Sequence, residues 1–465
     1  MSDIIYPTLD LFLYDLRNGL GDSQKEIGNN RETFQTKLPK DVQQNLFELD
    51  TDFDAEYVRL LASETSDFAG GSKPFLMKGY YYPVRIGDTY GLLLDCSVDN
   101  KTEAQTVSCI AALKKEILEV QLNNQTPSIG QTWMISGQLP SAATKTTEEI
   151  EQVAKTCYNS LMPDSKWEHD LEGKGEFLGA TIFELWRYRL LMKEENKNPA
   201  NIQSIQDNQH VFIVLYPDEE TAKKGAAFYD DWLRLFCYRN KILWAYGQSR
   251  LLKQSSGLNF IKIQSSLQFL KPEQPKLPDF KKLQKTLQQV QDTLTAYIIQ
   301  LNELDFQTLT IDINLSNYAK RLDTIDKKAG EKLEFLRKFS EIGSKKYLLQ
   351  VQKDSENLQL GLRLQEDLII AIRSRVEVEK AERESIFQNS VAIVGVGLGA
   401  TSILAALPGF QEIAKNDTLK SGLSNYMPVP DAWLTLTVAL IYSAGSALIF
   451  GTLTGIIIWL RQRFR

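Results

Sequence analysis

The 465-residue chain has little histidine, little cysteine and no excess of positive charge. Its two histidines, His169 and His210, are too few for a histidine-rich metal site or a histidine-based triad. Its four cysteines do not make a disulfide scaffold, and their spacing contains no CxxC pair that would favour a zinc site. The net charge of -6 disfavours a dedicated nucleic-acid binder, so we expect no nucleic-acid duplex as a partner.

Charge is absent from two long stretches near the carboxyl end, residues 386–407 and 433–460. The first has 22 residues. As a helix it would be about 33 Å long, enough to cross a hydrocarbon layer of about 30 Å. The second has 28 residues, with Trp433 and Trp459 near its ends, where aromatic rings prefer the membrane interface. Because a soluble helix of this length needs a polar face, we predict a transmembrane hairpin over 386–465 with an outer loop at 408–431.

Basic residues on both sides of this hairpin predict its orientation. They are Arg373, Arg375, Lys380 and Arg383 before the first stretch, and Arg461, Arg463 and Arg465 after the second. By the positive-inside rule both termini are cytoplasmic and the short loop is outside. The start, MSDIIYPTLD, shows no signal-peptide pattern. We therefore expect an integral protein of a bacterial inner membrane or a plasma membrane, with residues 1–385 in the cytosol.

A heptad pattern precedes the hairpin. Apolar residues recur at alternating steps of three and four from Phe280 to Ile325, which predicts one helix about 69 Å long. Residues 327–330 (Lys-Lys-Ala-Gly) are typical of a helix end. A second long helix is expected from Glu331, running into the first membrane stretch without a break. Residues 271–385 are thus predicted to form a long antiparallel helical stalk, whose seam either closes within the hairpin or continues between subunits.

Strand and helix patterns alternate in residues 1–270. Expected strands are 9–16, a hairpin over 75–98 that turns at Gly87-Asp88, 132–139 and 210–216; expected helices are 102–122, 146–161 and 219–253. This pattern predicts a mixed sheet and helix cytosolic domain and, for the chain, an α+β fold class. Three prolines in residues 271–278 mark the best linker candidate.

Catalytic patterns are scarce in this domain. Residues 69–73 (AGGSK) lack the P-loop spacing and are better explained as a surface loop. Glu168, His169 and Asp170 are adjacent, and adjacent helical residues do not face one another. The tyrosine run 80–82 fits a buried strand or a base-stacking surface equally well. A further set of carboxylates could bind divalent cations weakly, but we expect them to lie on solvated helix faces. They are Glu149, Glu151, Asp218, Glu219 and Glu220. No residue is predicted to be catalytic, and we expect no enzyme.

The two membrane stretches contain glycines and small polar residues but no ionisable side chain, which disfavours a proton relay. Amide and hydroxyl oxygens on a ring of such helices could line a narrow pore for a hydrated cation, or else bond between helices. Two helices cannot enclose a pore, so a channel requires a homo-oligomer. The pore-lining candidates are Asn389, Ser390, Gly395, Gly397, Thr401 and Ser402, and the outer-loop carboxylates expected to attract cations are Glu412, Asp417 and Asp431.

A large α/β domain, a long helix continuing into the first of two carboxyl-terminal spans, and a basic tail together resemble the CorA-type magnesium transporters. The resemblance implies a pentamer whose first span lines the pore. It also implies a Gly-Met-Asn filter in the outer loop, but this loop reads PGFQEIAKNDTLKSGLSNYMPVPD and lacks that motif. No metal-binding residue is therefore assigned. The resemblance implies no cofactor beyond Mg²⁺ or another divalent cation, as transported or regulatory ion.

The leading interpretation is a homo-oligomeric cation channel or transporter, gated by the cytosolic domain through the stalk. Its expected partners are membrane lipid, further copies of the chain and a small regulatory ligand. The alternative is a membrane-anchored effector in defence or signalling, whose cytosolic domain binds a nucleotide or a protein and acts on the membrane. A structural scaffold built on the coiled coil is a third interpretation.

Overall fold

The computed structural model describes residues 3–19, 22–47, 55–72, 75–121, 126–140, 142, 145–190, 206–267 and 280–380. Two compact units divide the chain. Unit 1 contains Met1–Ser255 and Gln300–Glu356, and unit 2 contains Ser256–Ile299 and the chain from Asn357 onwards. The domain boundaries predicted at 270/271 and 385/386 fall outside the described residues and stay predictions.

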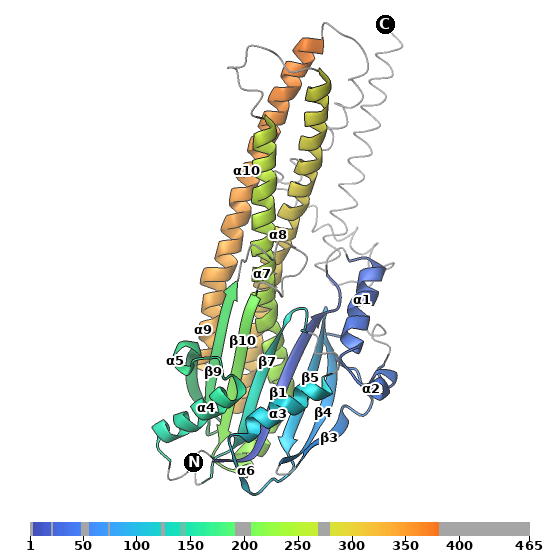
Figure 1. Cartoon of the computed structure of the whole chain (residues 1–465). Coiled ribbons are helices and arrows are strands. Elements are labelled where there is room, and N and C mark those ends of the chain that lie inside the picture. Colours follow the sequence, from blue (N-terminus) through green and yellow to red (C-terminus); the bar gives the residue numbers. More distant parts are fainter. Residues whose placement is uncertain are drawn as a thin grey trace, which may run out of the picture. The chain divides into compact units, whose positions relative to one another are not determined.

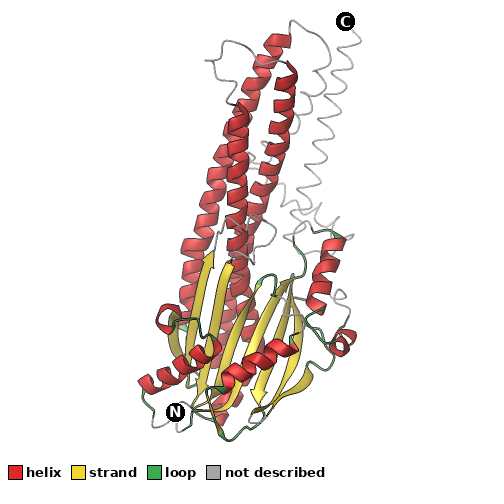
Figure 2. Cartoon of the chain, viewed as in Figure 1, coloured by secondary structure: helices red, strands yellow, loops and turns green. Residues whose placement is uncertain are grey.

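The described strands form one mixed sheet in unit 1, which confirms the α+β class (Figures 1 and 2). Its strand order is β2-β4-β5-β1-β7-β10-β9-β8, with β3 on β4 and β6 on β1. Neighbouring strands are antiparallel except β7 and β10, which are parallel. The bounds are β1 Asp3–Leu16, β2 Tyr57–Arg59, β3 Ser66–Ser72, β4 Phe75–Ile86, β5 Thr89–Val98, β6 Ala104–Thr106, β7 Gly130–Gln138, β8 Leu171–Phe177, β9 Ala180–Leu190 and β10 Gln206–Tyr216.

Helices cover both faces of the sheet because its strands are apolar on both sides. On β1, Leu9 and Leu11 belong to the core shared with α3 (Cys109–Val120) and α4 (Thr147–Leu161). The alternate residues Phe12 and Tyr14 face α7 (Tyr229–Leu267): the Phe12 and Phe236 ring centroids are 5.3 Å apart, and the Tyr14 hydroxyl donates to the Leu233 carbonyl at 2.8 Å. The remaining helices around the sheet are α1 (Gln24–Gln35), α2 (Lys40–Gln44), α5 (Trp167–Asp170), α6 (Glu219–Ala226) and α9 (Glu334–Ile342).

The predicted helical hairpin is present. Helix α8 spans Phe280–Ala329, and the returning chain forms α9, a π-helical segment η5 (Gly343–Leu348) and α10 (Leu349–Lys380). Within unit 1 the two directions are opposite: Tyr318 donates to the Leu336 carbonyl at 3.1 Å, and Ser355 bonds Asp305. Gly330 makes the turn at φ +76°, a left-handed conformation that favours glycine.

The heptad seam of α8 is occupied by the chain's own helices. Leu304, Ile311 and Leu322 are buried in unit 1. In unit 2, Val290 is buried, and Tyr297 donates its hydroxyl to the Leu358 carbonyl at 2.7 Å. In the residues that the structure describes, the contacts of this seam are those expected if the seam closes within the hairpin.

Helix α7 is a third member of the helical layer in unit 1, which the sequence analysis did not include in the stalk. The Tyr246 and Tyr347 rings lie 4.6 Å apart, and Arg250 and Lys253 both pair with the buried Asp354. The predicted helix 219–253 is split between α6 and α7, and α7 continues to Leu267 because no helix breaker occurs before Pro272.

Several strands were missed in the sequence. In β8, Gly173 and Gly175 replace the expected β-branched residues because the Phe335 ring of α9 lies against the strand: an added Cβ at either glycine would come within 2.6 Å of a ring carbon. A surface loop was predicted at 69–73. That prediction was wrong for Ala69–Ser72, which belong to β3 and pair with β4. None of the helices in the described ranges is both long enough and apolar enough to cross a membrane.

Candidate functional site

The pore and outer-loop predictions lie outside the described residues, as does the whole transmembrane hairpin. These residues are Asn389, Ser390, Gly395, Gly397, Thr401, Ser402, Glu412, Asp417 and Asp431. They stay predictions.

The other sequence candidates have structural roles. Glu168 pairs with Lys155, whereas Asp170 accepts from the Tyr158 hydroxyl at 2.7 Å, so the triplet around the exposed His169 does not converge. All four cysteines are buried free thiols, and burial raises the pKa of Cys157 to about 12, which excludes an activated thiolate there. The described residues contain no cluster of three or more histidine, cysteine or carboxylate side chains suited to a metal ion.

The surface carboxylates cap helices or pair along them, as expected for solvated helix faces. Glu149 accepts from the Thr146 amide at 2.7 Å in a capping box, and Asp218 accepts from the Thr221 amide at 2.8 Å. Glu219 and Glu220 pair with lysines one turn further along α6, and Glu151 pairs with Lys174.

A pocket of about 280 Å³ opens on the α6–α7 face of the sheet. Strand register explains its floor, because Tyr80 of β4 is opposite Asp95 of β5, and Asp95 is opposite Asp10 of β1. Helix α7 contributes Tyr229, whose hydroxyl donates to Asp10 Oδ2 at 2.8 Å. The lining residues are Tyr6, Thr8, Tyr80, Asp95, Ser136, Gly137, Gln138, Tyr216, Ala222, Ala226 and Tyr229.

Asp10 and Asp95 form a buried acid pair behind this lining. Asp10 is 0% exposed and Asp95 is 9% exposed. Burial, and then the charge of Asp95, raise the pKa of Asp10 well above its usual value. Burial also raises the pKa of Asp95, to about 7. The pair therefore retains a proton near neutral pH, since two adjacent carboxylates in a desolvated site cannot both ionise at low cost.

The acid pair has no basic partner in the described part of the chain: neither carboxylate forms an ion pair there. Asp10 and Asp95 hydrogen-bond each other through the proton that the pair retains. Burial and the charge of Asp10 raise the pKa of Tyr229, so its hydroxyl stays protonated and can donate to the pair. The pocket is therefore a site of negative potential with protonated tyrosines around it.

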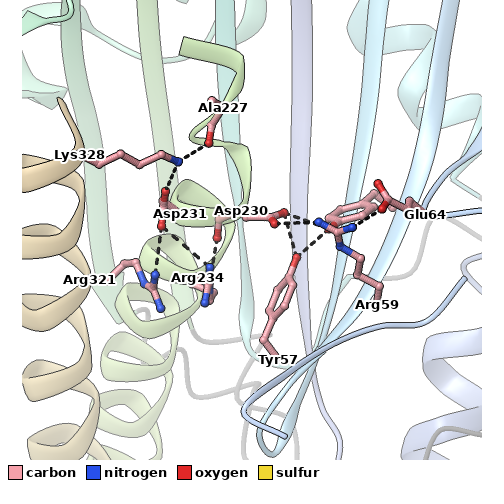
Figure 3. Close-up of polar contacts among 10 residues, drawn as sticks. Tyr57, Arg59, Glu64, Ala227, Asp230, Asp231, Arg234, Arg321 and Lys328 are labelled. Atoms are coloured by element: carbon pink, nitrogen blue, oxygen red, sulfur yellow. Dashed lines mark hydrogen bonds and ion pairs between the residues drawn. The ribbon is translucent and has the colours of Figure 1, made fainter. Parts of the chain in front are cut away.

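The residues after Tyr229 connect the pocket to other elements of unit 1 (Figure 3). Asp230 accepts from the hydroxyls of Tyr57 on β2 and Tyr82 on β4, both at 3.0 Å, and its other oxygen is 3.4 Å from Arg59. Arg234, one turn along α7, stacks on the Tyr57 ring at 4.7 Å. The first turn of α7 is thus held against the edge of the sheet.

Asp231 holds the same turn of α7 to α8. Its carboxylate is buried and pairs with Arg321 and Lys328 of α8, each at 3.0 Å (Figure 3). The Lys328 ammonium also bonds the Ala227 carbonyl and lies 4.2 Å from the Phe228 ring centroid. Three consecutive residues, Tyr229 to Asp231, therefore contact the pocket, the sheet edge and α8.

A second buried polar cluster lies further along α7. His210 bridges Thr132 at 2.9 Å and Glu184 at 3.3 Å, and burial lowers its pKa well below the usual value, so the ring is neutral. Arg239 is packed between the Trp186 and Phe339 rings, with Nε 3.7 Å from Glu184. The strand that carries His210, β10, is interior, between β7 and β9. No cavity opens onto this cluster among the described pockets, so we interpret it as structural.

Sequence reasoning singled out only one side chain of the pocket, through the run Tyr80–Tyr82. Tyr81 and Tyr82 are buried as that reasoning allowed, whereas Tyr80 lines the pocket. Two aspartates within apolar strands could have indicated this site: Asp10 in LDLFL and Asp95 in LLLDC. Such residues are unusual because an unpaired carboxylate is rarely buried.

No protein-family model, curated protein or solved structure matches this chain.

Proposed function

We propose that the chain is an integral membrane protein in which the α/β unit controls a cation pathway formed by the carboxyl-terminal spans of several identical copies. The first span would line the pathway, with Asn389, Ser390, Thr401 and Ser402 presenting amide and hydroxyl oxygens to a hydrated cation. Mg²⁺ or another divalent cation is the first ion to test, and a pentamer is the first assembly to test, both from the resemblance to CorA-type transporters.

One observation carries this proposal: α10 is helical to Lys380, only six residues before the charge-free stretch begins at Ile386. The same helix is anchored in unit 1 at Asp354, which is 3% exposed and pairs with Arg250 at 2.5 Å and Lys253 at 2.7 Å. A helix held in this way, whose described part ends six residues before an apolar segment, is suited to transmit movement to that segment.

A membrane-anchored sensor or effector is the second candidate, and the pocket is the observation that favours it. A cavity beside a buried acid pair that forms no ion pair in the described residues is more typical of a ligand site than of a purely structural core. The two candidates share the regulatory pocket and differ in whether the spans conduct a cation.

Ion flux into proteoliposomes that contain the purified full-length protein tests the proposal. We expect flux of at least one cation among Mg²⁺, Co²⁺, Ni²⁺, Zn²⁺, K⁺ and Na⁺. Thr401→Val should lower that flux about fivefold, because it removes one hydroxyl ligand worth about 1 kcal/mol without changing side-chain shape. Thr437→Val, the same change in the second span, should leave flux unaltered.

Two results would contradict the cation pathway. One is the absence of flux for every ion at all tested pH values and ligand conditions. The other is equal flux through the wild type, Thr401→Val and Thr437→Val, which would place the conducting path elsewhere than along the first span.

A further inference from the structure

The pocket beside Asp95 combines negative charge, aromatic rings and hydroxyl groups in one small cavity. Its carboxylate is backed by the fully buried Asp10, with which it shares a hydrogen bond, and no lysine, arginine or histidine of the described residues pairs with either group. Tyr80 and Tyr229 flank Asp95, and Tyr6 and Tyr216 complete the aromatic lining. A site with this composition is incomplete without a positively charged group.

We propose that this pocket binds an organic cation ending in a primary ammonium group, of the alkylamine or polyamine class. The ammonium would lie against Asp95 and donate hydrogen bonds to the hydroxyl oxygens of Thr8 and Ser136. The alkyl chain would pack on the tyrosine rings and on Ala222 and Ala226 of α6. Tyrosine faces attract a desolvated cation by about 1–2 kcal/mol each, which adds to the carboxylate attraction.

The cavity suits an organic cation better than a bare divalent metal ion. Its volume of about 280 Å³ is close to the small end of ordinary ligand pockets, about 300 Å³. A divalent ion needs about six oxygen ligands, whereas Asp95 is the one carboxylate among the described residues that line this pocket. The acid pair also supplies only two carboxylates, one of which, Asp10, is fully buried.

The chain already contains one instance of the proposed contact. The Lys101 ammonium lies over the ring of Tyr6, a lining residue, 5.2 Å from its centroid. Lys101 is exposed and forms no ion pair with Asp95 or Asp10 in the described structure, so it does not neutralise the acid pair. A free amine would bring the same chemical group to the deeper, carboxylate end of the pocket.

Binding of an amine should release the proton that the acid pair holds. The ionisable groups facing the pair are Tyr80 of β4, Tyr216 of β10 and Tyr229 of α7, all kept protonated by burial, so the carboxyls are the groups that titrate. An ammonium needs an ionised carboxylate as its partner, and burial holds the pKa of Asp95 near 7. Affinity should therefore rise about five- to tenfold between pH 6 and pH 8 by proton linkage.

Isothermal titration of full-length protein in detergent with butylammonium, 1-butanol and Mg²⁺ tests this proposal. We expect saturable binding of butylammonium and none of 1-butanol, which has the same chain without the charge. Asp95→Asn should weaken amine binding at least about tenfold, since one carboxylate contact to a charged group contributes roughly 1.5–3 kcal/mol. Tyr80→Leu, which leaves both carboxyls in place, should weaken it about three- to fivefold.

Asp99→Asn is the matched control, because Asp99 is an exposed carboxylate four residues further along the chain, paired with Lys78. It removes the same net charge and should leave binding unchanged. Equal binding by wild type and Asp95→Asn, or binding of Mg²⁺ with none of butylammonium, would overturn the proposal. The measurement concerns binding alone, so its outcome is independent of whether the spans conduct ions.

Discussion

Asp231→Ala is expected to destabilise unit 1 by about 2–4 kcal/mol, since it leaves two cations of α8 without their buried carboxylate. Arg321 loses its carboxylate partner, and Lys328 keeps the Ala227 carbonyl and the Phe228 ring. Urea unfolding of full-length protein in detergent, followed by tryptophan fluorescence, measures this. Five of the seven tryptophans precede residue 256 and therefore lie in unit 1.

Asp323→Ala is the control for this prediction. Asp323 is also an α8 aspartate in an ion pair, but it is 54% exposed, and its partner Arg337 retains Asp326. Exposed pairs contribute about 0–1 kcal/mol, so this variant should stay near the wild type. Equal unfolding free energies for the two variants would show that the contacts between Asp231 and α8 do not hold these helices together.

The acid pair predicts that unit 1 loses stability as pH rises. An aspartate titrates near 3.9 in the unfolded chain, whereas burial raises the pKa of Asp10 well above that value and that of Asp95 to about 7. Between these values the folded state binds more protons, so the free energy of unfolding falls with increasing pH. The loss should be on the order of 2–3 kcal/mol between pH 5 and pH 8, at about 1.4 kcal/mol per pKa unit.

Asp95→Asn should remove much of this pH dependence. The variant should match the wild type near pH 5, where the pair is protonated, and exceed its unfolding free energy at pH 8 by about 2 kcal/mol. Asp10 stays buried in this variant, and burial also raises the pKa of Glu184 to about 7, so a smaller slope of the same sign should persist. Parallel pH profiles for the wild type, Asp95→Asn and Asp99→Asn would contradict the account of a shared buried proton.

The sequence predicted elements wherever hydrophobic periodicity was strong. The seam from Phe280 to Ile325 predicted α8, and the glycine at 330 predicted its end. The hairpin of β4 and β5, turning at Gly87-Asp88, was also correct, since Gly87 adopts φ +55°. Strand β8 could not be predicted in this way, because its glycines are explained only by Phe335, more than 150 residues later in the chain.

The pocket could not be predicted because it depends on contacts distant in the chain. Asp10 and Asp95 become neighbours through the pairing of β1 with β5, and Tyr229 reaches them across 219 residues. Similarly, Asp231 meets Arg321 across 90 residues. The local sequence pattern identifies a carboxylate inside an apolar strand. It does not identify the residue that lies opposite on the neighbouring strand, so the sequence indicates an unusual residue but not a site.

The central claim is that several copies of this chain assemble around carboxyl-terminal helices that span a lipid bilayer. Particle images of the full-length protein reconstituted in lipid nanodiscs test it directly. The account predicts particles with rotational symmetry, fivefold if the resemblance to CorA-type transporters extends to assembly, and a central pathway through the bilayer. Monomeric particles, or full-length protein that stays in aqueous solution without detergent or lipid, would contradict it.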